Sequence, residues 1–162
     1  RLTIRLAVQH RGTVAVPYGL GLHPWLPRTP GMLLELPAPE VWLETSDHLP
    51  AGKVSIGARP EWDFVRPRPL PADWINNGFS GWRGTARVLW PEWGMQLTLA
   101  TTPELGTCIV YSPGGAATFF CLEPVSHPVD AYHLPDNPGL RTLRAGERFE
   151  VACTFHVAAI MG

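Results

Sequence analysis

Charged side chains are scarce in this sequence. They make up 17% of the 162 residues, and their signs nearly cancel to a formal net charge of −1. Nucleic acids and anionic membranes attract proteins mainly through basic surface charge. The composition therefore gives no reason to expect either partner, and we expect a neutral ligand instead.

Cysteine is also rare, and the three that occur, Cys108, Cys121 and Cys153, lie far apart. Zinc sites and disulfide frameworks use paired cysteines or histidines at characteristic spacings. Neither pattern is present, so no metal site is expected. We predict three reduced thiols in the core.

Long apolar runs are missing as well. None approaches the ~20 residues that span a bilayer, and the first residues lack the basic-then-apolar layout of a signal peptide. We therefore expect a cytoplasmic protein. Because the first residue is Arg1 and a strand pattern is under way by Leu2, we expect a piece of a longer chain.

Helical periodicity of ordinary length is absent, whereas proline and glycine are abundant, with 18 and 16 residues. A chain of this length is expected to form one domain. Many short apolar segments between frequent turns are typical of an all-β sandwich or barrel.

Period-2 alternation predicts where the strands lie. A first strand over 2–8 is expected to be buried on one face, and a glycine-containing turn is expected to join it in a hairpin to a strand over 13–16. Segments 32–36 and 41–44 are expected to form a meander. Further strands are predicted over 85–90, 95–101, 107–111, 118–123 and 148–157. The proline-rich stretch 47–71 predicts a surface excursion with one short strand near 54–56.

Two ionisable side chains stand at predicted strand ends. Glu123 follows an apolar segment and precedes Pro124, which has no amide hydrogen for further pairing. His23 precedes Pro24 in the same way, beside an aromatic side chain. A carboxylate near buried aromatics has the character of a general base when burial raises its pKa. The alternatives, a surface glutamate that closes a strand and a hydrogen-bonded turn histidine, remain open.

The densest cluster of aromatic and amide side chains lies at 74–82 and includes Asn76, Asn77 and Trp82. Sugars present hydroxyl groups at their edges and C–H groups on their faces, so amide donors beside aromatic rings suit them. An Asn-Gly turn flanked by core aromatics explains the same residues equally well.

Three segments in this order resemble the aldose 1-epimerase (galactose mutarotase) family, namely Gly-Leu-Gly-Leu-His-Pro-Trp at 19–25, Asn-Asn-Gly-Phe-Ser-Gly-Trp at 76–82 and Cys-Leu-Glu-Pro-Val-Ser-His at 121–127. The resemblance extends over essentially the whole chain. It implies a galactose-mutarotase-like β-supersandwich, of which residues 1–162 are the C-terminal part. The sandwich is then incomplete, and a missing N-terminal segment or a second chain is expected to complete it.

The resemblance also implies site residues and an activity. His23 takes the role of general acid and Glu123 that of general base in the interconversion of α and β anomers of a free aldohexose, without metal or cofactor. The substrate-binding candidates are Asn76, Asn77, Trp25, Trp82 and His127. For His127, a role in orienting its own loop through hydrogen bonds is the alternative.

Two departures from the family's pattern matter. The second motif usually carries an acidic residue where this sequence has Asn76, and the family's N-terminal part supplies an arginine and another histidine that have no counterpart here. A non-catalytic carbohydrate-binding module on the same fold therefore remains an alternative function. A structural fragment that contributes strands to a partner chain is a third.

Overall fold

The computed structural model describes residues 1–160 and is nearly all β. In this part of the chain the only helices are four 3-10 turns, η1 (Ile56–Ala58), η2 (Pro60–Trp62), η3 (Pro91–Trp93) and η4 (Ala131–His133). The strands are β1 (Leu2–Gln9), β2 (Val16–Tyr18), β3 (Trp25–Pro27), β4 (Leu33–Glu35), β5 (Glu40–Glu44), β6 (Pro50–Ser55), β7 (Ile75–Ser80), β8 (Thr85–Trp90), β9 (Met95–Thr101), β10 (Thr107–Ser112), β11 (Phe119–Val125), β12 (Arg141–Leu143) and β13 (Arg148–Ala159). The predicted all-β class is confirmed.

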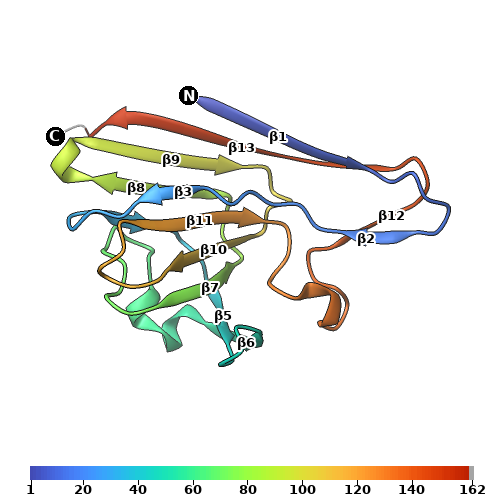
Figure 1. The fold of residues 1–162 in the computed structure, drawn as a ribbon, viewed down its shortest axis with the longest axis horizontal. Coiled ribbons are helices and arrows are strands. Elements are labelled where there is room, and N and C mark those ends of the chain that lie inside the picture. Colours follow the sequence, from blue (N-terminus) through green and yellow to red (C-terminus); the bar gives the residue numbers. More distant parts are fainter. Residues whose placement is uncertain (161–162) are drawn as a thin grey trace.

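Two antiparallel sheets form the body of the molecule (Figure 1). One has five strands in the order β1-β13-β9-β8-β4, and the other has six in the order β3-β11-β10-β7-β5-β6. In Figure 1 the first lies above the second, while the β2–β12 pair extends to one side. The main core between the sheets includes Leu34, Val41, Phe79, Leu99, Val110, Phe120 and Leu122. This inner packing leaves the outer face of the six-stranded sheet available for other roles.

The later strands agree with the alternation in the sequence. Segments 85–90 and 95–101 coincide with β8 and β9, and the last three predicted strands differ from the observed ones by a few residues at their ends. Along β13, Phe149, Val151 and Cys153 are buried. All three cysteines are free and buried. Among the described residues, no helix is long and apolar enough to cross a membrane.

The predicted hairpin between 2–8 and 13–16 is wrong. β1 pairs instead with β13, where Leu2 stands opposite Phe155, and β2 pairs with β12. The buried His10 accounts for the break. Its backbone continues the pairing with Glu147 and Gly146, and its ring bonds the Tyr18 hydroxyl at 2.8 Å and the Val14 carbonyl at 2.7 Å. Residues 11–15 therefore form a loop.

The predicted meander over 32–36 and 41–44 is also wrong, because the two segments enter different sheets. β4 pairs with β8, whereas β5 pairs with β6 and β7. Leu34 and Val41 are both fully buried and face the common core from opposite sides. The stretch 47–71 holds β6 near the expected place, yet its Phe64 is a core residue rather than part of a surface excursion.

β1 is exposed, contrary to the prediction that one of its faces is buried. Leu2 is 59% exposed, and Ile4 and Leu6 are each 37% exposed. They occupy the edge of the five-stranded sheet, beside a groove of about 630 Å³. The groove is lined mostly by apolar side chains, including Leu26, Trp90, Phe155 and Val157. The two sheets therefore do not close on each other at this edge.

Candidate active site

β11 places Glu123 on the outer face of the six-stranded sheet. Its inward residues Phe120 and Leu122 are fully buried, and each large apolar side chain buried in this way contributes about 1.5–3 kcal/mol to stability. Side chains alternate along a strand, so Cys121 and Glu123 both point the other way. The strand that carries the carboxylate is thus anchored by the core.

Pro124 does not end the strand, contrary to the prediction. β11 continues to Val125, and Pro124 stands opposite Cys108 of β10. The Pro124 carbonyl accepts a hydrogen bond from the Leu22 amide at 3.0 Å. The nitrogen and carbonyl of one strand residue point the same way, so the missing N–H falls on the irregular segment before β3 instead of the β10 ladder.

His23 lies in that irregular segment, between an isolated bridge at Gly21–Val125 and the start of β3. The chain follows β11 here because two hydrogen bonds flank the Gly21–Val125 bridge: the Leu22 amide donates to the Pro124 carbonyl, and the Leu20 carbonyl accepts from the Ser126 amide. A side chain at Gly21 would meet the Val125 side chain at 2.5 Å, so only glycine permits this approach. The result is a histidine beside the outer face of β11.

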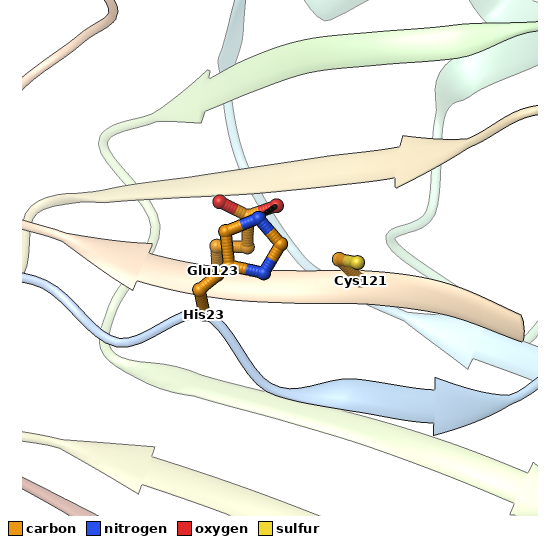
Figure 2. Close-up of side chains that lie close together, drawn as sticks. All are labelled: His23, Cys121 and Glu123. Atoms are coloured by element: carbon orange, nitrogen blue, oxygen red, sulfur yellow. Dashed lines mark ion pairs between the residues drawn. The ribbon is translucent and has the colours of Figure 1, made fainter.

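The structure brings His23 and Glu123 into direct contact. His23 Nε2 lies 3.2 Å from Glu123 Oε1, and the His23 ring lies over the strand (Figure 2). The Glu123 side chain is 11% exposed, whereas that of His23 is 58% exposed. Burial raises the pKa of Glu123, and the nearby His23 lowers it in part. The pair thus joins a nearly buried carboxylate to a largely solvent-exposed imidazole.

Aromatic rings extend away from this pair across the outer face. Trp25 lies beside His23 and stacks on Phe119, with 4.2 Å between ring centroids. Phe119 contacts Tyr111, which meets Trp74 edge-to-face. Trp25 is 62% exposed, so its ring offers a flat apolar surface next to the His23–Glu123 pair.

A second carboxylate, Glu44 of β5, lies farther along the same face. It accepts hydrogen bonds from Trp74 Nε1 at 2.7 Å, from Asn76 Nδ2 at 3.1 Å and from His48 Nδ1 at 3.1 Å. Asn76 stands opposite Tyr111, which stands opposite Cys121. Two strand spacings therefore separate this carboxylate–amide group from β11, about 10 Å. Sequence reasoning missed Glu44 because nothing near it in the chain marks it.

Comparison with known proteins decides the family. The sequence profile described as aldose 1-epimerase matches residues 1–156. The chain belongs to the aldose 1-epimerase family.

Relatives of this family member come from several bacteria. The uncharacterized protein YphB of Escherichia coli (strain K12) is 38% identical over 152 residues, which is 90% of this chain and 52% of that protein. A crystal structure of a candidate aldose 1-epimerase from Escherichia coli K12 has a TM-score of 0.90 at 34% identity, over 97% of this chain and 56% of that one. A galactose mutarotase-like protein from Clostridium acetobutylicum, with a TM-score of 0.82 at 14% identity over 97% of this chain and 52% of that one, shares the fold. The chain spans about half the length of these relatives.

Two residues expected to contact sugar do not reach the outer face in this aldose 1-epimerase family member. Asn77 is buried and donates its side-chain amide to the Trp42 carbonyl at 2.8 Å. Trp82 is buried in the core and donates Nε1 to the Leu105 carbonyl at 2.7 Å. Asn77 points inward with Ile75 and Phe79 because side chains alternate along β7, which is a strand and not an Asn-Gly turn, whereas Trp82 lies beyond the end of that strand. We leave both out of the proposed site.

His127 lies in the loop after β11, packed over Gly19. A side chain at Gly19 would come within 1.9 Å of the His127 ring, and His127 Nδ1 lies 2.9 Å from the Pro128 carbonyl. These contacts fit the alternative in which His127 orients its own loop. The neighbouring Ser126 accepts a hydrogen bond from the Leu20 amide, which ties this loop to the segment that leads to His23.

The same loop gives a stability prediction at Gly139. Its φ is +73°, and an added Cβ would lie 2.0 Å from the Ser126 carbonyl oxygen. Gly139→Ala should therefore lower the free energy of unfolding by more than about 2 kcal/mol, because left-handed strain adds to a backbone clash. Urea denaturation measures the change.

Gly146 provides the matched control. Its φ is +82° and nothing lies within 4 Å of an added Cβ. Gly146→Ala should cost only the backbone strain, about 1 kcal/mol. Equal losses of unfolding free energy in the two variants would show that a side chain at position 139 does not clash with the Ser126 carbonyl.

Cys121 places a third donor atom close to the His23–Glu123 pair. Its Sγ, one nitrogen of His23 and one oxygen of Glu123 all lie within 4.8 Å of one another. This is the one group of three or more histidine, cysteine and acidic side chains in residues 1–160 with metal-binding proximity. The sequence did not indicate it, because the three residues lack a recognisable spacing.

Proposed function

We propose that the protein containing this chain is an aldose 1-epimerase that interconverts the α and β anomers of a free aldohexose by acid–base ring opening. The observation that carries the proposal is the 3.2 Å contact between His23 Nε2 and Glu123 Oε1 on an exposed, aromatic-lined face. Ring opening at a hemiacetal carbon needs one base within reach of the hydroxyl oxygen and one acid within reach of the ring oxygen on that carbon. Since the chain spans about half the length of its relatives, the activity is proposed for the whole protein.

The reaction divides between the two side chains. Ionised Glu123 takes the proton of the C1 hydroxyl while protonated His23 donates a proton to the ring oxygen. The bond between C1 and the ring oxygen breaks, and an open-chain aldehyde forms. Rotation about C1–C2 presents the other carbonyl face, and closure reverses both proton transfers.

The different exposure of the two groups suits these steps. Glu123 is held by a strand whose neighbours are buried, which fixes the base. The exposed His23 is free to swing away from Glu123 as a sugar enters between them. In the absence of sugar the two groups satisfy each other, so neither is left unpaired.

The remaining sugar contacts are proposed along the outer face. Trp25 offers a ring for stacking against sugar C–H groups. A hollow of about 20 Å³ beside Glu44, Asn76 and Gly78 has room for one water or hydroxyl group. Glu44 thus provides the carboxylate that position 76 lacks. Trp25 and Asn76 are the sugar-binding candidates from the sequence that reach this face.

Polarimetry tests the proposal. A freshly dissolved single anomer of an aldohexose changes its optical rotation until the anomers equilibrate, and the protein should accelerate this change in proportion to its concentration. The final rotation should equal that of the uncatalysed reaction, since an epimerase shifts only the rate. A rate equal to that of buffer over a panel of aldohexoses would refute the proposal.

The pH dependence of the rate gives a further prediction. Glu123 acts as a base only when ionised, so activity is lost as pH falls through its pKa. Burial raises that pKa above the ordinary value of 4.5. The acid limb of the pH–rate profile of kcat/KM should therefore lie at higher pH than for an exposed glutamate.

His23→Gln provides the control for that assignment. The charge of His23 lowers the pKa of Glu123 in part, so its removal should move the acid limb of the residual activity to still higher pH. A limb that stays in place or moves to lower pH would assign it to another group.

A further inference from the structure

We propose that His23, Cys121 and Glu123 form a binding site for a divalent transition-metal ion such as Zn²⁺, and that the bound ion blocks the acid–base pair. The binding of metal is independent of the proposed function. Only the inhibitory consequence rests on it.

The geometry provides three donors of different types around one point. Cys121 and Glu123 are separated by one residue on β11, so both project from the outer face of the strand. His23 reaches over Glu123 from the neighbouring segment, and Cys121 lies to one side of the ring (Figure 2). The three donor atoms lie within 4.8 Å of one another, and a central ion with bonds of about 2.0–2.3 Å requires only a small contraction of that triangle.

The donor set selects the kind of ion. Thiolate and imidazole favour Zn²⁺ and similar transition metals over the hard cations Mg²⁺ and Ca²⁺, which prefer oxygen. A thiolate and a carboxylate together balance the charge of a divalent ion. Three protein ligands leave the fourth tetrahedral position to water.

The positions of the ligands favour binding. Cys121 is fully buried and Glu123 nearly so, hence β11 holds two ligands in place with little freedom to lose. His23 is 58% exposed and can adjust by side-chain rotation. As the metal–sulfur bond forms, the Cys121 thiol proton passes to solvent, and no oxidation or reduction is involved.

Inhibition follows from which atoms the metal occupies. The ion takes the Glu123 oxygen that would accept the C1 hydroxyl proton and the His23 nitrogen that would donate to the ring oxygen. Neither proton transfer can then proceed. Removal of the ion by a chelator should free both side chains for proton transfer.

Cobalt titration of the full protein tests the site directly, since Co²⁺ bound to a thiolate gives an intense near-ultraviolet charge-transfer absorption. The wild-type protein should develop this band with one Co²⁺ per chain, and Zn²⁺ should displace it. Cys121→Ser should abolish the band, whereas Cys153→Ser, which alters another buried cysteine, should keep it. No band in the wild-type protein, or an undiminished band in Cys121→Ser, overturns the proposal.

His23→Asn keeps the test decisive if Cys121→Ser fails to fold. Because His23 is exposed, its replacement should preserve the fold while weakening Zn²⁺ at least about tenfold in calorimetry. Unchanged Zn²⁺ affinity would contradict the site.

A separate rate measurement tests the inhibition. Zn²⁺ should slow anomer interconversion, and a chelator should restore the rate. If the protein has no epimerase activity, the cobalt spectrum still decides whether the metal site exists. If it is active, bears the thiolate band and is insensitive to Zn²⁺, the blocking part of the proposal is wrong.

Discussion

Glu123→Gln should lower the catalysed rate of anomer interconversion at neutral pH by at least about 100-fold, the range for loss of a general acid or base. Glutamine matches glutamate in size and can hydrogen-bond the C1 hydroxyl, but it cannot remove a proton. The loss should appear mainly in kcat, because the contact with the sugar is preserved. Polarimetry over a range of sugar concentrations separates kcat from KM.

The stability of Glu123→Gln should exclude unfolding as the cause. Burial raises the pKa of Glu123, which means that the folded state prefers the neutral form. The resulting stabilisation is complete below the unfolded pKa and is lost as pH rises through the folded pKa. Glutamine mimics the neutral form, so the Tm of the variant at neutral pH should equal or exceed that of the wild type.

Glu40→Gln is a suitable control. Glu40 lies on the same sheet, and its partner is Lys53 at 2.7 Å in a partly exposed ion pair. Such pairs contribute at most about 1 kcal/mol, and the substitution should leave the rate unchanged. A Glu123→Gln rate close to that of Glu40→Gln would remove Glu123 from the role of base.

His23→Gln should have the second large effect, a loss of at least about 100-fold in kcat. The amide of glutamine can still donate a hydrogen bond to Glu123, but it cannot transfer a proton to the ring oxygen. Polarimetry at neutral pH measures the loss.

The exposure of His23 makes this variant informative. Because its side chain is 58% exposed and lies outside the core, the Tm should change little. His133→Gln is the matched control, since His133 is an exposed histidine that pairs with the carboxylate of Asp130. Full activity in His23→Gln would mean that another group, or water, protonates the ring oxygen.

Side-chain alternation made much of the fold predictable from the sequence. β8, β9, β10 and β13 largely alternate between more and less buried residues, and β11 is a short apolar run, so a local pattern was enough to locate them. Pairing was not predictable in this way. β1 pairs with β13, more than 130 residues away along the chain. The predicted hairpin paired β1 with the next segment instead, because local sequence carries no information about distant partners.

The residues of the candidate site also fall into those that the sequence indicated and those that only the strand pairing revealed. His23, Glu123, Trp25 and Asn76 were identified from the sequence and lie on one face of the six-stranded sheet. Glu44 and Cys121 were recognised as site residues only from their neighbours in the folded structure. Asn77 and Trp82 were chosen for their chemistry, yet the strand β7 turns Asn77 inward and the core encloses Trp82. Chemical type alone could not reveal the direction of a side chain.

Exchange NMR on an equilibrated aldohexose in D₂O tests the central claim most directly. Magnetisation should transfer between the C1 protons of the α and β anomers at a rate that rises with protein concentration. No deuterium should enter at C1 or C2, because ring opening moves only protons bound to oxygen. Absence of protein-dependent exchange, or deuterium incorporation at C2, would contradict the account.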